Sequence, residues 1–239
     1  MELPLHPNAC VLARHPAGLV ALDKPPGVRS HPNSAEPDHR ALLHLPYEAE
    51  SEAYRMDDGS GEAVFLLHRL DAPTSGVVLM ATDSAVATAV RDAFARHTVR
   101  KTYYALVRGL PARREETWRD RLRVRRERGT LRADVGAGDL AETRIECLVT
   151  FSGPPVLSLL RLRPVTGRTH QLRVQCAARR LPIVGDATYG DFRFNRNYAR
   201  QTGEKRLFLH AAALHLEGDR MCLPAFEVQS PIPSAFPAF

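Results

Sequence analysis

Short apolar runs of strand length recur along the chain, and most are bounded by turn-forming residues. Gly18 to Lys24 predicts a strand that ends at Pro25-Pro26-Gly27, because two prolines and a glycine cannot continue a sheet. Val77 to Ala81 is a second run of this kind. Three further strands are predicted downstream, at Tyr103 to Val107, Thr143 to Phe151 and Val156 to Leu162.

Two other segments show the apolar spacing of helices. Ser84 offers an N-cap for a helix whose apolar face runs from Val86 to His97. Thr169 to Arg180 has the same spacing and places Arg173 near a helix start. Strands outnumber helices and do not alternate regularly with them. The pattern therefore predicts an α+β fold with a mixed, mostly antiparallel central sheet flanked by helices and loops.

The clearest interruption of this pattern covers about residues 30–61, which are rich in Pro, Glu, Asp, His and Ser. We expect an irregular insertion there, with a short helical piece around Arg40 to Leu45. With 239 residues and 44% hydrophobic content, the chain can bury one large core, so residues 1–239 are expected to form a single, monomeric domain. The apolar runs are too short to cross a bilayer, and Met1 to Cys10 lacks the order of a signal peptide. We therefore expect a cytoplasmic protein with no membrane partner.

Positive charge is concentrated in one segment. The whole chain has a formal net charge of +6, and Arg113 to Arg132 alone contains nine arginines and four acidic residues, a net charge of +5. A mixed charge run is usually a solvated face. The functional alternative is a hairpin or loop that contacts RNA phosphates, with Arg113, Arg121 and Arg125 as its candidate residues. Charge alone leaves both interpretations open.

Metal and nucleotide sites are not indicated by the sequence. The cysteines are far apart, so neither a zinc knuckle nor a CxxC redox pair is expected, and free buried thiols are predicted at Cys10, Cys147, Cys176 and Cys222. Four histidines cluster without ligand spacing: His31, His39, His44 and His68. Gly136 to Ala141 fits a dinucleotide pattern, but a strand-like segment follows it where a helix would be required. With no Walker A sequence either, no metal and no cofactor is expected.

One carboxylate stands apart by its position. Asp71 lies in the segment His68 to Gly76, between the apolar run Val64 to Leu67 and the strand at Val77. An acid on a turn between two strands is held rigidly at a surface, as a nucleophile must be. The alternative is an Asp-initiated turn, whose carboxylate bonds backbone amides two residues on. Composition and spacing favour the turn.

The segment HRLDAPTSG resembles the HRLDxxTSG signature of the RluA-type pseudouridine synthases. Further blocks occur in that family's order between Leu22 and Leu214: LDKPPG followed by HP, then KTYYALV, TGRTHQLR, PIVGD and LHA. One tetrapeptide can arise by chance, but six blocks in order cannot be explained that way. The chain is identified as a member of this family. The resemblance implies the pseudouridine synthase catalytic fold and an enzyme that isomerises specific uridines of structured RNA without metal or cofactor.

The resemblance also implies roles for single residues. Asp71 would be the nucleophile, Tyr103 the aromatic that contacts the target base, and Arg173 the basic partner of the carboxylate. Tyr104 is the adjacent alternative to Tyr103, and Arg168 is the alternative to Arg173. Five residues are expected to bind substrate: Lys24, His68, Arg69, Arg168 and Leu172. The carboxylate can attack the sugar carbon or the base, or assist formation of a glycal, and the sequence does not choose among these routes.

Two details resemble the TruC-type branch, which acts on a T-arm uridine of tRNA. Pro73 stands where many family members have an acid, and Gly190 to Arg196 with Arg206 to His210 is similar to the GDxRxNR…RLxLHA stretch of that branch. Val174 follows the general family instead. We expect tRNA as the substrate ahead of ribosomal RNA, bound by the catalytic domain without an S4-like module. The alternatives are a catalytically inactive RNA-binding relative and a base glycosylase.

Overall fold

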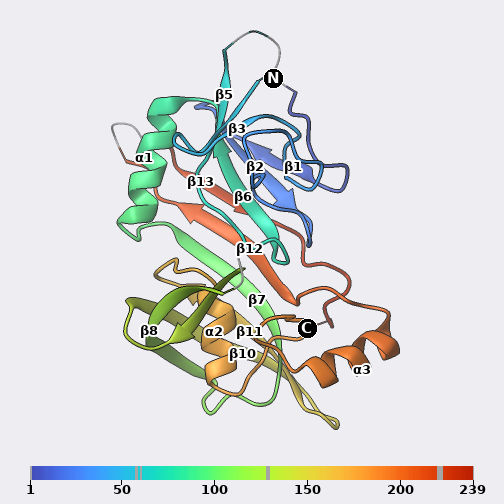
Figure 1. The fold of residues 1–239 in the computed structure, drawn as a ribbon. Coiled ribbons are helices and arrows are strands. Elements are labelled where there is room, and N and C mark those ends of the chain that lie inside the picture. The colour runs from blue at the N-terminus through green and yellow to red at the C-terminus, as the bar shows by residue number, and fades with distance from the viewer. Residues whose placement is uncertain (1, 57–58, 60, 128–129, 220–222, 239) are drawn as a thin grey trace. The chain divides into compact units, whose positions relative to one another are not determined.

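The computed structural model describes residues 2–56, 59, 61–127, 130–219 and 223–238 (Figure 1). They form two compact units. Unit 1 comprises the chain up to Arg100 together with Ala211–Pro231, and unit 2 comprises Lys101–His210 together with Ile232–Phe239. The predicted α+β fold with a mostly antiparallel sheet is confirmed. The organisation as a single domain stays a prediction.

Unit 1 is built around strand β6 (Ser75–Ala81), whose seven residues are all buried. β6 pairs antiparallel with β2 (Leu19–Lys24) and β5 (Ala63–Leu66), and it neighbours β12 (Leu209–Leu216). The remaining strands pair with these three directly or in sequence: β1 (Cys10–Arg14) with β2, β13 (Phe226–Gln229) with β12, and β3 (Tyr47–Glu48) with β4 (Ala53–Arg55), which pairs with β5. The strands predicted before Pro25 and at Val77 are thus confirmed.

Helix α1 (Ser84–Ala95) packs its buried Ala87, Val90 and Ala93 into the same core as β6 (Figure 1). The prediction placed its N-cap at Ser84, and this was wrong by one residue. Asp83 is the N-cap, and its carboxylate accepts a hydrogen bond from the amide of Val86. Both residue types cap helices well, and the negative charge of Asp83 is further favoured by the helix dipole.

The segment 30–61 contributes to the core of unit 1. Ala41, Leu42 and Leu43 are fully buried, and no helix forms at residues 40–45, so that expectation was wrong. Ala41 and Leu43 instead form isolated bridges to Arg29 and Leu5. These long-range backbone pairings take the place of the hydrogen bonds that a local helix would form. Residues 57, 58 and 60 of this segment lie outside the described residues.

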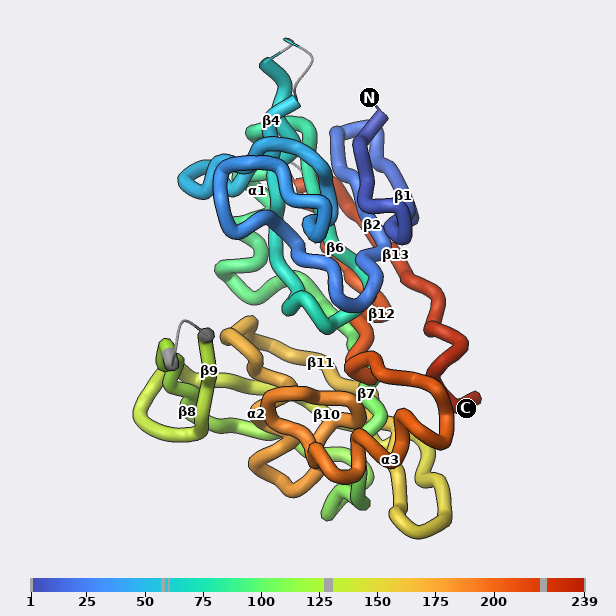
Figure 2. Tube along the Cα trace, turned by 45° about the vertical axis from the view of Figure 1, so that its right-hand side comes forward, coloured from blue at the N-terminus to red at the C-terminus, as the bar shows by residue number. Residues whose placement is uncertain are grey.

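Unit 2 contains five strands in the antiparallel order β7-β11-β10-β8-β9 (Figure 2). Their bounds are β7 (Arg100–Arg108), β8 (Glu115–Glu127), β9 (Thr130–Val135), β10 (Asp139–Phe151) and β11 (Leu157–Pro164). Within the described residues, the arginine-rich segment therefore supplies β8 and the start of β9, and Arg113 and Arg114 precede β8. Trp118 and Leu122 on β8 are buried, while the alternating arginines between and beside them are exposed. This alternation is the period of a half-buried strand.

Two helices belong to unit 2, α2 (Gln171–Ala178) and α3 (Phe192–Thr202). α2 lies within the predicted range Thr169 to Arg180, and its first six residues are all buried. The core beside it includes Trp118, Leu160 and Phe208. No helix of the described chain is long and apolar enough to cross a bilayer.

The cysteines follow the prediction in part. Cys147 and Cys176 are buried free thiols, but Cys10 is exposed on β1. Cys222 lies outside the described residues.

Candidate active site

Asp71 lies on the loop between β5 and β6 in unit 1, and its side chain is partly exposed. The backbone carbonyl of Asp71 accepts a hydrogen bond from the amide of Thr74 at 2.9 Å, which closes a turn through Ala72 and Pro73. This main-chain hydrogen bond defines the turn that carries the Asp71 side chain.

The buried side chain of Lys24 holds this loop in place. Its side chain is fully buried, and its ammonium group donates to the carbonyls of Val28 at 2.6 Å, Ala72 at 2.9 Å and Pro25 at 3.0 Å. An ammonium group has three N–H donors, and these carbonyls match that number. Lys24 thus fixes the backbone at Ala72, next to Asp71. We propose this positioning role in place of the substrate contact expected from the sequence.

The residues just before Asp71 are pinned by neighbours distant in sequence. The hydroxyl of Ser30 bonds both the amide and the carbonyl of Leu70, each at 3.0 Å. The carbonyl of Ser30 accepts from the Tyr54 hydroxyl at 2.6 Å. The sequence did not identify Ser30 and Tyr54 as site residues, because no local pattern in the segment 30–61 links them to Asp71.

His68 also supports the loop. Its Nε2 accepts a hydrogen bond from the amide of Leu79 at 3.0 Å, so the ring is tied to strand β6. The ring also lies 4.9 Å from that of Phe94 on α1. These contacts favour a structural role for His68, and the substrate contact expected for it stays a prediction.

Gly76, the last residue of the HRLDAPTSG segment, allows β6 to approach β12 closely. Its φ is +111°, and a Cβ atom there would lie 2.1 Å from the carbonyl oxygen of Ala211. A side chain at this position would be strained in its backbone and would also collide with the neighbouring strand. The glycine is therefore required by the packing that follows the Asp71 loop.

Arg69 is exposed two residues before Asp71. Its Nη1 lies 3.4 Å from Nε2 of His31, whose ring stacks on Tyr47 with 4.9 Å between centroids. An exposed guanidinium beside an aromatic stack suits contact with RNA, as expected from the sequence. That contact stays a prediction.

In unit 2, Tyr103 lies on β7 opposite Leu162 of β11, and it is partly buried. Tyr104 is opposite Arg161, and strand alternation directs it to the other face of the sheet. Near the start of the same strand, burial lowers the pKa of Lys101 to about 8, and its ammonium lies 3.5 Å from the carbonyl oxygen of Thr166. A phosphate near Lys101 would favour its charged form.

Arg173 lies on α2 and is almost completely buried. Its Nε and Nη2 donate to the two carboxylate oxygens of Asp186 at 2.8 and 2.9 Å, a bidentate ion pair. The guanidinium also lies 5.2 Å from the centre of the Tyr189 ring. Asp186 and Tyr189 were missed as site residues, although Asp186 ends the PIVGD block.

The charge of Asp186 is stabilised despite its burial. Burial opposes ionisation, but the hydrogen bonds and charge of Arg173 and the amides of Tyr189 and Thr188 hold the pKa of this carboxyl below its usual value. The pair is therefore ionised at neutral pH and fixes the orientation of the guanidinium plane.

The residues around Arg173 serve different purposes. Gln171 accepts from the Thr166 hydroxyl at 2.7 Å and from the Arg168 amide at 2.9 Å, which shapes the loop before α2. The side chain of Arg168 points to the surface, where it lies 3.3 Å from the carboxylate of Asp139. Leu172 is 7% exposed and belongs to the hydrophobic core. Their substrate contacts stay predictions, and the core position of Leu172 favours a packing role.

The arginines of the β8–β9 pair are partly neutralised by local acids. Asp134 lies 3.2 Å from Arg123 and 3.5 Å from Arg125. Arg121 donates to the Gly138 carbonyl at 3.1 Å, and Arg113 is exposed. Exposed ion pairs contribute only about 0–1 kcal/mol, so a phosphate can replace the carboxylate. Among the residues that the structure describes, no group of three His, Cys, Asp or Glu could hold a metal ion.

The described site thus offers a carboxylate on a strand-to-strand loop and an arginine-rich strand pair, and such a basic surface suits a polyanion such as a nucleic acid. The family model for RNA pseudouridylate synthase matches residues 18–178, and the chain belongs to this family.

The similar proteins agree with this assignment. tRNA pseudouridine synthase C of Yersinia pestis is 35% identical over 207 residues, which cover 83% of this chain and 77% of that protein. The enzyme of the same name from Vibrio cholerae is 35% identical over 206 residues, covering 82% and 80%. Among solved structures, human RNA pseudouridylate synthase domain containing 1 superposes with a TM-score of 0.68 and 27% identity, covering 97% of this chain and 86% of that one.

Proposed function

We propose that this protein is a tRNA pseudouridine synthase, which isomerises a specific uridine of tRNA. The observation that carries the proposal is the 35% identity to tRNA pseudouridine synthase C over more than four fifths of the chain. The stretch from Gly190 to Arg196, which resembles the TruC-type branch, supports the same substrate. Ribosomal RNA is the alternative substrate.

Asp71 acts as the nucleophile in this proposal. The reaction breaks the bond between N1 of the base and the sugar, turns the base, joins C5 to the same sugar carbon and releases the C5 proton. The carboxylate attacks the sugar carbon or the base, or assists formation of a glycal. The hydrogen bonds of Lys24 and Ser30 support this role, because they hold the backbone on both sides of Asp71.

Arg173 serves as the basic partner of the Asp71 carboxylate beneath a bound base. A base that covers the carboxylate would remove water from it, and a nearby guanidinium offsets this loss of hydration. A guanidinium has five N–H donors, so pairing with Asp186 is compatible with a second carboxylate. The pair with Asp186 fixes the orientation of the Arg173 guanidinium within unit 2.

Tyr103 contacts the target base. A base in folded RNA must leave its stack before it can turn, and an aromatic side chain can stack on it. The hydroxyl of Tyr103 is the group that receives the C5 proton. An enzyme that modifies tRNA works where tRNA is found, so the proposal includes a cytoplasmic location. The monomeric state expected from the sequence stays a prediction.

Tritium release from uridine labelled at C5 tests the reaction. Purified protein is incubated with labelled, unmodified tRNA and, in parallel, with labelled ribosomal RNA transcripts. We expect tritium release from tRNA without free base. Release from ribosomal RNA alone would reassign the substrate, and free uracil would indicate a glycosylase, which usually needs a second carboxylate. RNA binding without release would identify an inactive relative.

A further inference from the structure

Helix α3 carries an exposed stripe of one aromatic and two basic side chains. The helix lies between its N-cap Asp191 and its C-cap Gly203, and none of its residues is buried. Phe192, Arg196 and Arg200 are spaced by four residues and therefore lie on one face. Phe192 is 53% exposed, and among the described phenylalanines it alone is exposed.

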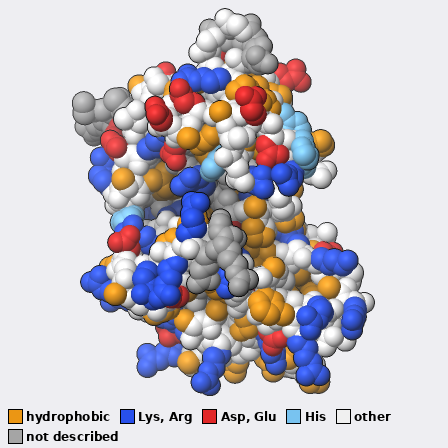
Figure 3. Space-filling model, viewed as in Figure 1, with side chains coloured by type: hydrophobic (Ala, Val, Ile, Leu, Met, Phe, Trp, Pro, Cys, Tyr) orange, Lys and Arg blue, Asp and Glu red, His pale blue; other side chains and the backbone are white. Residues whose placement is uncertain are grey.

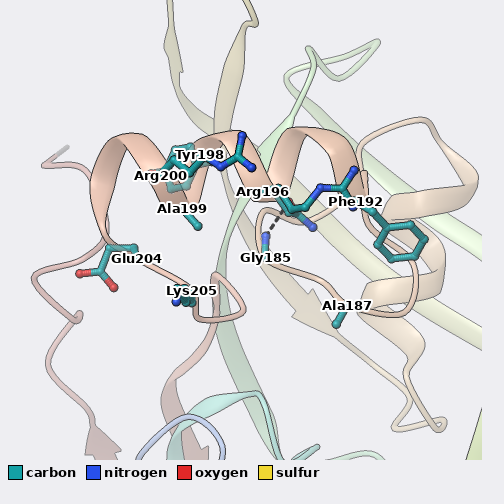
Figure 4. Close-up of a pocket in the computed structure, with 10 residues that line it drawn as sticks. Gly185, Ala187, Phe192, Arg196, Tyr198, Ala199, Arg200, Glu204 and Lys205 are labelled. Atoms are coloured by element: carbon teal, nitrogen blue, oxygen red, sulfur yellow. Dashed lines mark hydrogen bonds between the residues drawn. The ribbon is translucent and has the colours of Figure 1, made fainter.

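This stripe borders a cavity of about 650 Å³ within unit 2. Figure 4 shows α3 along one side of the cavity, with Ala187 and Lys205 on the other. Such a volume is large enough for a nucleotide-sized ligand. The lining residues on α3 and just after it are Phe192, Asn195, Arg196, Tyr198, Ala199, Arg200, Glu204 and Lys205.

The basic residues of this cavity differ in charge balance from those of the β8–β9 pair. Within the described chain, Arg196, Arg200 and Lys205 form no ion pair, and Glu204 is the single acid of the lining. Arg123 and Arg125 of the β8–β9 pair, in contrast, both lie against Asp134. Figure 3 shows Lys and Arg side chains gathered over α3. The net positive charge of the lining is complementary to a phosphate group.

The cavity is preformed because α3 is attached firmly to the segment beneath it. Asn195 accepts from the Gly185 amide at 2.9 Å and donates to the Asp186 carbonyl at 3.0 Å. Tyr198 packs its ring edge-on against Phe208 at 5.5 Å. A site that is ordered before binding loses less conformational entropy when a ligand arrives.

We propose that this cavity binds an unpaired nucleotide of the substrate RNA, with its base against Phe192 and its phosphate against Arg196, Arg200 and Lys205. The proposal rests on the proposed function, because it takes the modified RNA as the ligand. Unstacked bases of RNA are recognised by stacking on aromatic side chains and by cationic contacts to the backbone. Glu204 can accept a hydrogen bond from a base amino group or a 2′-hydroxyl.

Fluorescence anisotropy with labelled, unmodified tRNA over a series of salt concentrations tests the site. We expect Phe192→Ala to weaken affinity roughly tenfold with little change in salt slope, because it removes a stacking platform. The double variant Arg196→Gln/Arg200→Gln should reduce the slope of log affinity against log salt by up to about 0.7, the value for one neutralised phosphate of a single strand.

Arg193→Gln is the matched control. Arg193 is exposed on the same helix but does not line the cavity. The tRNA affinity of the Arg193→Gln variant should therefore change far less. Because α3 buries no residue, all variants should unfold at the temperature of the unmodified protein.

The inference is overturned if the Phe192 and Arg196/Arg200 variants bind tRNA as the Arg193 variant does. Tritium release by the unmodified protein is measured separately. Absent release together with the expected affinity losses would overturn the isomerase proposal and leave the RNA site standing. Normal tritium release with unchanged affinities would support the isomerase proposal and overturn the RNA site on α3.

Discussion

Two buried cations in this protein are satisfied in different ways, and both support the proposed site. Lys24 is surrounded by three backbone carbonyls, which hold the Asp71 loop. Arg173 is paired with the carboxylate of Asp186, which holds a side chain. A buried charge without such partners would cost roughly several kcal/mol, so each arrangement fixes its surroundings strongly. Lys24 and Arg173 each determine the geometry of the groups that surround them.

Lys24→Met separates a positioning role from substrate binding. Methionine keeps much of the apolar stem but leaves the carbonyls of Val28, Ala72 and Pro25 without their donor. We expect a loss of roughly 1–3 kcal/mol in the free energy of unfolding and a clear fall in the rate of isomerisation. Affinity for tRNA, measured by anisotropy, should stay within about twofold. A loss of affinity with an unchanged single-turnover rate would favour direct substrate contact.

Gly76→Ala should destabilise unit 1 more than Gly27→Ala. Both glycines have positive φ, but a Cβ atom at Gly27 meets nothing within 4 Å, whereas one at Gly76 collides with Ala211. Backbone strain alone costs about 1–2 kcal/mol at Gly27, and overpacking adds roughly 1–3 kcal/mol at Gly76. Urea denaturation measures both changes. Equal losses would show that β12 moves aside without cost.

Asp186→Asn should be strongly destabilising, by roughly 3–5 kcal/mol at pH 7, because it removes the carboxylate that binds both Nε and Nη2 of the buried Arg173. The pKa of Asp186 is lower in the folded than in the unfolded protein. Its contribution is thus complete above about pH 4 and is lost as pH falls through the folded pKa. Denaturation at several pH values should show the variant converging on the unmodified protein in acid. A constant difference down to about pH 2 would contradict this account.

At the scale of elements, the sequence predicts those with a clear apolar period. β2, β6, β7, β10, β11, α1 and α2 were all expected at or near their observed positions. α3 was not expected, because FRFNRNYARQT is mostly polar and buries no residue, so no apolar period marks it. The contribution of segment 30–61 to the core of unit 1 was not predicted either. Its buried residues pack through long-range contacts that no local pattern contains.

The arginine-rich segment around the β8–β9 strand pair is expected to contact RNA phosphates. Arg113, Arg121 and Arg125 changed together to Ala should weaken tRNA affinity and flatten its salt dependence, with the slope reduced by about 1 for each phosphate that is no longer neutralised. Unfolding should be little affected, since the three side chains are exposed. The matched control changes Arg14, an exposed arginine of β1 in unit 1. If the salt slope is unchanged, the main phosphate contacts lie elsewhere, for example on α3.

At the scale of the whole molecule, membership of the RNA pseudouridylate synthase family was predictable from six ordered sequence blocks, and the family model confirms it over residues 18–178. The residues that support the site could not be predicted from the sequence. Ser30 contacts Leu70 across 40 positions, and Asp186 contacts Arg173 across 13. Such pairs depend on the folded chain, which the spacing of residues along the sequence does not specify.

We propose Asp71 as the nucleophile of a uridine isomerase, and tritium release by the Asp71→Asn variant tests this role. Asparagine keeps the size of the side chain but removes its charge, so the turn closed by the backbone of Asp71 should form as before. With labelled tRNA in single turnover, we expect the unmodified protein to release tritium and Asp71→Asn to release none above background, while both bind tRNA. Release by Asp71→Asn at a rate comparable to that of the unmodified protein would contradict the account.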